Sequence, residues 1–411
     1  MFIKTKHRNT HHHIISIAVI VGALGYFVDV YDLILFSIIR KSSLTSLGLN
    51  PIIDGENILS IQMIGLLIGG IIWGVLGDKR GRLSVLFGSI LLYSLANIAN
   101  GFVQTYNQYA VLRFIAGIGL AGELGASITL VSELVSKEQR GICTSIVASV
   151  GLLGAVAAYF MKQSFDWRIC YFIGGAMGLV LLVLRVSIFE SGMFARLKQS
   201  NVQRGNFFML FSPGERLSRY LKCILIGLPT WFIVGILIGF SDKFGTELKL
   251  TEPIDVGKSI LAFYIAGCIG DIIIGFLSNA MKSRKKPVYI YFFISAICIF
   301  LYFTQSGGSA TMMYLICAGL GFGTGFWAIF VTMAAEQFGT NIRATATTTV
   351  PNMVRGSLPL IIILFKWLRS VTENNYVMSR WITALICMSI ALVALYFKNE
   401  TFGKDLNFVE A

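Results

Sequence analysis

Charged side chains are scarce in this chain of 411 residues: they make up 13% of it, against 55% for hydrophobic side chains. Because soluble proteins carry about 25% charged residues, this composition excludes an ordinary soluble protein, and with it a soluble enzyme. The mean hydropathy of +0.73 is spread along the chain rather than held in one anchor. The sequence therefore predicts an all-α membrane protein with many spans.

Several chemical motifs are also missing. The seven cysteines form no C-x-x-C pair and are typical of small core residues, so neither a metal nor another cofactor is expected. No phosphate-binding loop of the G-x-x-x-x-G-K-[ST] kind occurs, which argues against ATP as the energy source. All four histidines lie before the first span, at His7, His11, His12 and His13. A proton that crosses the membrane must therefore be carried by carboxylates.

Twelve stretches are apolar and long enough to cross the bilayer, which takes about 20 residues of helix. They cover residues 14–39, 56–77, 84–103, 107–132, 141–162, 168–189, 221–241, 256–279, 287–304, 310–334, 344–368 and 379–397. The first follows Lys4, Lys6 and Arg8, but it holds two carboxylates and lacks a clean cleavage site. It is therefore expected to be a permanent span rather than a signal peptide.

Basic residues are distributed unevenly between the two sides of the membrane. The chain has 34 Lys and Arg against 21 Asp and Glu, and 21 of the 34 fall in segments on the side of the N-terminus, against 10 on the opposite side. This is the positive-inside pattern, so both termini are predicted to be cytoplasmic and no nucleic-acid partner is needed to explain the net charge. The short loops suit a bacterial inner membrane, and a monomer suffices for this architecture.

The longest connection between spans, residues 190–220, is polar and basic. It divides the chain into an N-terminal six-helix bundle (1–190), a cytoplasmic linker (191–220) and a C-terminal six-helix bundle (221–411). A solvated linker is the simpler interpretation of its charges, and a lipid or partner site is the alternative.

The second bundle repeats the first. The loop from Gly74 to Arg82 has a counterpart from Gly275 to Arg284, at an offset of 201. A glutamate followed by an arginine seven positions later occurs as Glu133 and Arg140 and again, 203 residues on, as Glu336 and Arg343. Such parallel repeats are common in secondary transporters, where the substrate lies between the halves near the membrane midplane.

These motifs resemble those of the major facilitator superfamily. Gly74 to Arg82 resembles its loop signature, and the Glu-x6-Arg pairs resemble the charge relays of its sugar porters and metabolite:proton symporters. Arg113 to Glu123 is similar to the fourth-helix signature of the latter, although Ala116 stands where that branch usually has Gln. Asp29-Val-Tyr-Asp32 is similar to the first-helix motif of the metabolite and aromatic-acid proton symporters. The resemblance covers the whole chain and implies two bundles that rock about a central site.

The resemblance also implies a cytoplasmic charge network that latches one conformation. Its members would be Asp78, Arg82, Glu133 and Arg140, with Glu336 and Arg343 in the second half. The second copy departs from the pattern because Asn279 replaces the acid and Arg284 lies five residues further on rather than four. The second latch is therefore expected to be weaker or differently paired. Ordinary helix-end charges are the alternative interpretation.

Four carboxylates lie inside the predicted spans and are candidates for proton coupling: Asp29, Asp32, Glu123 and Asp271. Ionisable groups at membrane depth are costly and usually line a cavity or meet a partner. Asp29 and Asp32 share a helix face, where two carboxylates repel and one can hold a proton. The alternative is structural: one of them pairs with Arg113 or caps a neighbour.

Candidate substrate ligands are two arginines within spans and three aromatic residues: Arg113, Arg355, Tyr31, Trp231 and Trp327. A guanidinium binds a carboxylate at two points, although either arginine can equally form a fixed ion pair. The aromatic rings can stack on a substrate or simply pack in the bundle.

The sequence thus predicts a secondary transporter, not an enzyme, whose partners are a small-molecule substrate, protons and the lipid bilayer. Proton-coupled uptake of a small organic anion or related metabolite is the leading hypothesis. The alternative is proton-coupled export or import of a drug, amino acid, nucleoside or polycarboxylate siderophore. Drug:proton antiporters of the superfamily typically carry a Gly-Pro signature in helix five, and here residues 140–162 contain no proline. None of these motifs names a substrate.

Overall fold

The computed structural model describes residues 2–184, 202–372 and 376–410, and every regular element in these ranges is a helix. Twelve stretches of the described residues are long and apolar enough to span a membrane, which confirms the predicted number. In chain order the helices are α1 (Phe2–Ser46), α2 (Ile53–Arg80), α3 (Arg82–Asn100), α4 (Tyr106–Leu120), α5 (Glu123–Leu134), α6 (Arg140–Ser164), α7 (Trp167–Leu184), η2 (Phe207–Phe211), α9 (Gly214–Phe232), η3 (Ile233–Ile238), α10 (Ser241–Glu247), α11 (Val256–Ala280), α12 (Lys285–Thr304), α13 (Ala310–Thr324), α14 (Trp327–Ala335), α15 (Arg343–Gly356), α16 (Leu358–Val371) and α17 (Tyr376–Tyr396).

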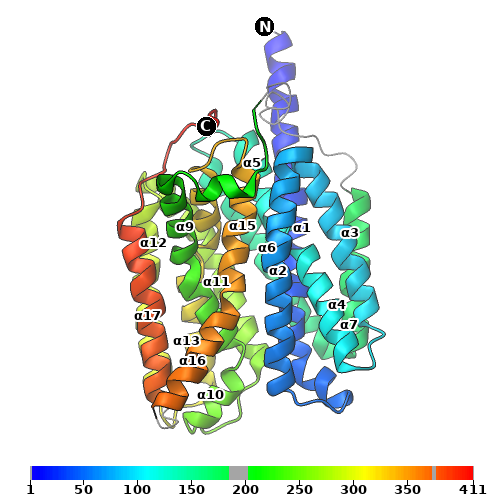
Figure 1. Cartoon of the computed structure of the whole chain (residues 1–411), viewed down its shortest axis with the longest axis vertical. Coiled ribbons are helices and arrows are strands. Elements are labelled where there is room, and N and C mark those ends of the chain that lie inside the picture. The colour runs from blue at the N-terminus through cyan, green and yellow to red at the C-terminus, as the bar shows by residue number, and fades with distance from the viewer. Residues whose placement is uncertain (1, 185–201, 373–375, 411) are drawn as a thin grey trace.

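The helices form two bundles side by side, α1 to α7 in one and α9 to α17 in the other (Figure 1). Across the boundary α2 packs on α15 and α6 packs on α11. Both ends of the chain lie at the same end of the molecule (Figure 1), which is called the termini face below; the other end is the opposite face. The predicted boundary at residue 190 and the start of the linker fall outside the described residues.

Several spans consist of two pieces. α4 gives way to α5 at Ala121 and Gly122, and α13 gives way to α14 at Gly325 and Phe326. These two breaks occupy equivalent places in the repeat. The start of α6 at Arg140 likewise corresponds to the start of α15 at Arg343. Span seven continues from α9 into a π-helical segment, η3, a feature often found at functional sites.

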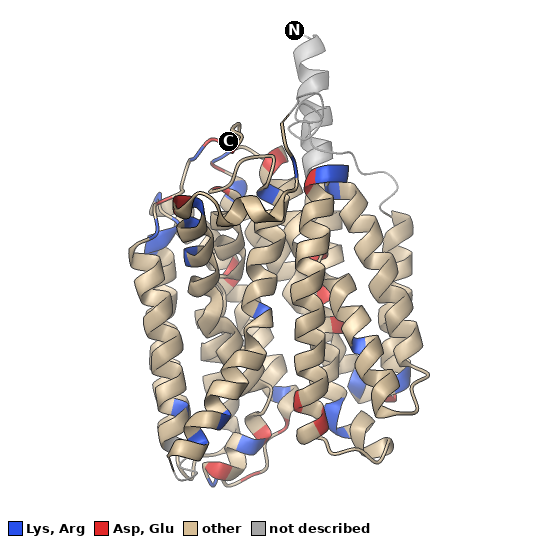
Figure 2. Cartoon of the chain, in the orientation of Figure 1, with Lys and Arg blue, Asp and Glu red and all other residues tan. Residues whose placement is uncertain are grey.

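Charged residues gather at the two faces, and the middle of the molecule is almost free of them (Figure 2). The outer surface of the spans instead exposes large apolar side chains such as Val183, Phe293 and Leu360. This banding is that of a protein surrounded by hydrocarbon. The few charges drawn at mid-height are therefore enclosed by protein, where ionisable groups usually line a cavity or meet a partner (Figure 2).

Glycines let the helices that carry this site approach closely. A Cβ added to Gly321 of α13 would overlap the carbonyl oxygen of Phe263 on α11, and one added to Gly65 of α2 would overlap the carbonyl oxygen of Phe114 on α4. Backbone contact of this kind requires a residue without a side chain. The contact at Gly321 fixes the helix segment that presents Phe263 to the centre of the molecule.

Candidate functional site

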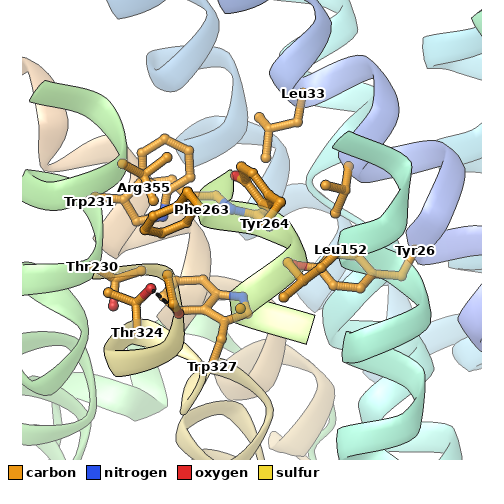
Figure 3. A pocket seen from close by; sticks show the side chains of 15 residues that line it. Tyr26, Leu33, Leu152, Thr230, Trp231, Phe263, Tyr264, Thr324, Trp327 and Arg355 are labelled. Atoms are coloured by element: carbon orange, nitrogen blue, oxygen red, sulfur yellow. Dashed lines mark hydrogen bonds between the residues drawn. The ribbon is translucent and has the colours of Figure 1, made fainter. Parts of the chain in front are cut away.

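A cavity lies between the two bundles, and the space between its lining residues, including the part open to solvent, is about 460 Å³. The first bundle contributes side chains from α1 and α6, and the second contributes side chains from α9, η3, α11, α13, α14 and α15. Figure 3 shows side chains of both halves around the cavity. The lining residues are Tyr26, Val30, Leu33, Leu152, Thr230, Trp231, Val234, Phe263, Tyr264, Gly267, Gly321, Thr324, Gly325, Trp327 and Arg355.

Arg355 is the one charged residue among these fifteen. Its side chain is almost fully buried, and its Nη1 donates to Oδ1 of Asn352 at 3.2 Å. Its Nε has no hydrogen-bond partner among the described residues. The guanidinium lies 5.9 Å from the ring of Trp327. A buried arginine with an unused donor in an otherwise uncharged cavity is suited to binding an anion.

Five aromatic side chains surround this cation: Tyr26, Trp231, Phe263, Tyr264 and Trp327. Aromatic rings pair favourably with other rings in offset or edge-to-face arrangements. The cavity therefore combines one positive charge with apolar walls suited to a ring. The neighbouring Asn352 also donates to the carbonyl oxygen of Ala121 at 2.8 Å, so the arginine is tied through Asn352 to the break in the fourth span of the other half.

Three of the five predicted substrate ligands line the cavity: Trp231, Trp327 and Arg355. The other two do not. The hydroxyl of Tyr31 points to α7, where it donates to the carbonyl oxygen of Cys170 at 2.9 Å. Arg113 is fully buried within the first bundle. Both therefore belong to the packing of that bundle rather than to the cavity wall.

Arg113 instead accompanies the acidic motif of α1. Its Nη2 donates to the main-chain oxygen of Asp32 at 3.2 Å, and its Nη1 donates to Oδ1 of Asn97 at 3.3 Å. Arg113 and Asn97 both act electrostatically or by hydrogen bonding on the Asp32 carboxylate. The ring of Tyr171 lies 5.5 Å from the guanidinium. Asp32 thus lies in a closed polar pocket inside the first bundle.

The remaining intramembrane acids occupy different surroundings. Asp29 is fully buried and acts on the hydroxyl of Tyr26, so it lies on the cavity side of α1. Glu123 is buried at the start of α5 and accepts from Oγ of Ser127 at 3.2 Å. Asp271 lies on α11, where Oδ1 accepts from the main-chain nitrogen of Ala328 at 3.2 Å. The four predicted proton carriers therefore do not form one cluster.

Six predicted gating residues and Arg284 gather at the termini face. This group, the termini-face network, consists of Asp78, Arg82, Glu133, Arg140, Arg284, Glu336 and Arg343. Oε1 of Glu133 accepts from Arg82 of its own half at 2.8 Å and from Arg343 of the other half at 3.0 Å. Their side chains are fully buried. Each arginine therefore contacts the same carboxylate, and the two halves are joined there.

The second half contains a matching arrangement. Oε1 of Glu336 accepts from Arg284 of its own half at 2.9 Å and from Arg140 of the other half at 3.1 Å. Asp78 of the first half and its counterpart Asn279 of the second half have different partners. Asp78 accepts from the main-chain nitrogens of Ala344 and Thr345 at 3.0 and 2.8 Å, at the start of α15. Asn279 donates to the carbonyl oxygen of Glu138 at 2.7 Å, ahead of α6.

The C-terminal segment, residues 397–410, lies against this network. Oγ1 of Thr401 donates to Glu336 at 2.8 Å, and Nη1 of Arg140 donates to the carbonyl oxygen of Lys404 at 3.3 Å. Burial opposes ionisation of Glu400, but hydrogen bonds from Ser283 and from main-chain amides outweigh it and hold the pKa of this carboxyl below its usual value. The segment thus adds contacts to both halves at the termini face.

Comparison with known proteins places this geometry in a family. The family model described as Major Facilitator Superfamily matches residues 15–362. The chain belongs to the major facilitator superfamily. A niacin transporter of Acinetobacter baylyi is 26% identical to it over 95% of each chain. A 3-(3-hydroxy-phenyl)propionate transporter of Escherichia coli is 26% identical over 84% of this chain and 85% of its own.

Solved structures agree on the fold. The proton:xylose symporter XylE, bound to 6-bromo-6-deoxy-D-glucose, superposes with a TM-score of 0.78 at 16% identity, over 97% of this chain and 98% of that one. Superfamily membership confirms the resemblance seen in the sequence and the predicted fold class. It also confirms that the chain is an integral membrane transporter and not an enzyme.

A major facilitator must open each face in turn, and the contacts of this chain differ between its faces. At the opposite face Arg40 lies 3.7 Å from Asp242, and Lys366 lies 2.6 Å from Glu56, each pair joining the two halves. The side chains of Asp242 and Lys366 are 40% and 53% exposed. Exposed pairs contribute little, whereas removing one partner of a buried pair costs about 3 to 5 kcal/mol. The termini face is therefore the more firmly closed of the two.

The cavity is also lined by residues that the sequence did not predict, among them Phe263, Tyr264, Thr230 and Thr324. Tyr264 carries a usable signal. It lies seven positions before Asp271, and residues seven apart share one face of a helix. Aromatic residues on the face of an intramembrane acid were therefore detectable. Phe263, Thr230 and Thr324 were not detectable, because phenylalanine and threonine occur at many other positions of the spans.

Replacing Asp78 with Asn is expected to loosen the termini face. The carboxylate makes three hydrogen bonds at the start of α15, including one from Oγ1 of Thr345, and its charge is favourable at a helix N-terminus. Asparagine keeps the size but loses the charge. Thiol labelling of a cysteine introduced at Thr348, which is buried between the halves, should become about tenfold faster in a cysteine-free background.

The control for this measurement is Lys79→Gln, which changes an exposed charge in the same last turn of α2 and should leave labelling as in the parent. Equal labelling of Asp78→Asn and the parent would show that the carboxylate does not hold this face closed.

Proposed function

We propose that this chain is a proton-coupled importer of small aromatic carboxylates that works by alternating access. The observation that carries the proposal is the cavity: five aromatic side chains around one buried arginine, between the two halves. A ring would pack against the aromatic walls while its carboxylate pairs with Arg355. A neutral sugar would leave the buried cation without a counter-charge.

The names of the relatives support the same substrate class. Niacin and 3-(3-hydroxyphenyl)propionate each combine one aromatic ring with one carboxyl group. The two proteins named for them match this chain over most of its length. The structural neighbour transports xylose, but at 16% identity it bears on the fold alone.

Proton coupling is proposed for the acidic pair of α1. Asp29 and Asp32 lie on the helix that also supplies Tyr26, Val30 and Leu33 to the cavity. Both carboxylates are fully buried, where taking up a proton removes the cost of burying a negative charge. Loading and unloading of that proton can therefore change how α1 packs between the cavity and its own bundle. Glu123 is a further candidate in the same half.

The termini face is proposed to be the cytoplasmic face of a bacterial inner membrane, because the basic excess gathers on that side of the chain. Import then begins with the opposite face open. After substrate binds, the ion pairs of the opposite face, Arg40 with Asp242 and Lys366 with Glu56, form again. The termini-face network then separates, and the substrate is released. Since the network is buried and extensive, this second step is expected to limit turnover.

Uptake by proteoliposomes tests the proposal. An inward proton gradient should drive accumulation of nicotinate and benzoate, each with proton entry recorded by a trapped pH dye. The uncharged analogues nicotinamide and benzyl alcohol should neither accumulate nor move protons. Vesicles without the protein, and vesicles with a protonophore, are the controls. Proton entry with xylose, alanine or citrate but not with the aromatic acids would reject this substrate class.

A further inference from the structure

Asp271 is a buried acid one turn beyond Gly267, a lining residue of the cavity, on the same helix. Its two carboxylate oxygens differ. Oδ1 accepts from the main-chain nitrogen of Ala328 in the first turn of α14, whereas Oδ2 has no hydrogen-bond partner among the described residues. A charged carboxylate with one oxygen unsatisfied is costly in a buried site. A proton on the carboxyl group would remove that cost.

The acid is held directly against the break in the tenth span. A Cβ added to Gly325 would lie 2.8 Å from the main-chain nitrogen of Asp271, and one added to Gly270 would lie 2.7 Å from the carbonyl oxygen of Phe322. The backbones of α11 and of the break are therefore in contact at Gly270 and Asp271. Because this contact leaves little free space, a change in the hydrogen bond between Asp271 and Ala328 is expected to move the start of α14.

The start of α14 is also part of the cavity wall. Trp327 precedes Ala328 in the chain, lines the cavity and lies 5.9 Å from the guanidinium of Arg355. The indole of Trp327 also interacts with the hydroxyl of Tyr26. One hydrogen bond thus connects Asp271 to the ring that lies beside the proposed carboxylate ligand.

Other ionisable groups around Asp271 come from three helices. Tyr26 on α1, Tyr291 on α12 and Cys268 on α11 itself each interact with its charge. Tyr26 also interacts with Asp29 and Arg355. From α6 Ser149 donates to the carbonyl oxygen of Cys268, and α13 and α14 contribute backbone and uncharged side chains. Within the described residues no arginine or lysine is paired with Asp271.

We propose that Asp271 is a positioning residue whose protonation sets the affinity of the cavity for the substrate carboxylate. This inference rests on the proposed function. An ionised Asp271 holds the start of α14 by a charged hydrogen bond. Its negative charge also opposes the binding of a substrate carboxylate to Arg355. A neutral Asp271 weakens that hold and removes the repulsion. Proton uptake and substrate binding therefore favour each other.

Because proton binding and substrate binding affect each other reciprocally, the pH on each side of the membrane determines where substrate binds and where it is released. Where protons are abundant, Asp271 is neutral and the cavity binds the acid tightly. Where protons are scarce, Asp271 is ionised and the acid is released. This role differs from that proposed for the α1 pair: Asp271 sets the affinity of the cavity at the pH of the solution to which the cavity is open, whereas the α1 pair is proposed to carry the proton that drives accumulation.

The test compares the wild type with Asp271→Asn, whose amide oxygen can still accept from Ala328 but cannot take up a proton. Benzoate counterflow is measured with equal pH on both sides of the vesicle, over a range of pH. The KM of the wild type should rise about five- to tenfold from acidic to alkaline buffer. In Asp271→Asn it should stay near the acidic value at every pH, while kcat falls by less than about threefold. Glu252→Gln, an exposed acid at the opposite face, should keep the wild-type profile.

A second readout needs no substrate. Because Trp327 moves with the start of α14, the intrinsic tryptophan fluorescence of the wild type should titrate with pH, and this transition should be absent in Asp271→Asn and restored in Asp271→Glu. A wild-type pH profile of both KM and fluorescence in Asp271→Asn would overturn the inference. Failure of the wild type to exchange benzoate or nicotinate would reject the proposed function alone, since the fluorescence titration still decides the role of Asp271.

Discussion

Replacing Arg355 with Gln is expected to raise the KM for benzoate by about 100-fold, because truncating one partner of a buried charge pair costs about 2 to 5 kcal/mol. Among the described residues that line the cavity, Arg355 is the one with a charged side chain, so no second cation of that set can take its place. Glutamine keeps a polar group near Asn352 but supplies no charge for the carboxylate. Initial rates of labelled benzoate uptake, with binding measured by calorimetry on purified protein, give the change directly.

Arg380 provides a matched control for the loss of a buried arginine. It is also in the second half and 3% exposed, but its Nη2 donates to the carbonyl oxygen of Phe303 and it does not line the cavity. Arg380→Gln should lower stability without changing the KM of correctly folded protein. Arg355→Lys should recover part of the affinity, because a lysine keeps the charge and loses the two-point geometry. Equal KM values for Arg355→Gln and Arg380→Gln would remove Arg355 from the site.

The spans and the repeat were predictable because hydrocarbon imposes them. Any helix that crosses the bilayer needs about 20 apolar residues, so hydropathy alone located all twelve stretches. The paired offsets of Glu133 with Glu336 and of Arg140 with Arg343 then predicted the two halves. The structure brings these four residues together at one face, because a parallel repeat places equivalent helix ends on the same side.

The breaks in the spans were not predictable from hydropathy. Residues 121 and 122 and residues 325 and 326 are as apolar as their neighbours, so hydropathy does not mark them. Each pair contains a glycine, but other glycines in the same spans lie within unbroken helix. What stabilises them comes from other helices: the carbonyl oxygen of Ala121 accepts from Asn352, and the start of α14 is capped by Asp271. These partners are about 230 and 57 positions away in the chain.

Spacing along α1 likewise did not reveal which acid faces which neighbour. Asp29 and Asp32 share a broad helix face, but the first acts on Tyr26 at the cavity and the second lies beside Arg113 and Asn97. The sequence allowed Arg113 to serve either a substrate or an α1 carboxylate. Its electrostatic effect on the Asp32 carboxylate, together with its hydrogen bonds to the main-chain oxygen of Asp32 and to Asn97, favours the second alternative. These contacts follow from the packing of α4 against both α1 and α3.

Neutralising both acids of α1, with Asp29→Asn and Asp32→Asn together, is expected to abolish uphill accumulation while leaving exchange. With one proton per substrate, a gradient of one pH unit is worth about 1.4 kcal/mol and supports about tenfold accumulation. Without a proton carrier the ratio should fall to one. Benzoate counterflow should persist, because substrate exchange needs the cavity and the two gates but no net proton movement.

The single variants then separate the two carboxylates, and Gly174→Ala tests Asp32 without removing a charge. A Cβ at residue 174 would overlap Oδ1 of Asp32, so alanine must push that carboxylate out of its pocket with Arg113. Gly174→Ala should therefore reproduce the coupling defect of Asp32→Asn if Asp32 carries the proton, and should leave accumulation intact if Asp29 does. Wild-type accumulation in the double variant would show that neither acid is required, and Glu123 would then be the remaining carboxylate of that half able to couple transport to protons.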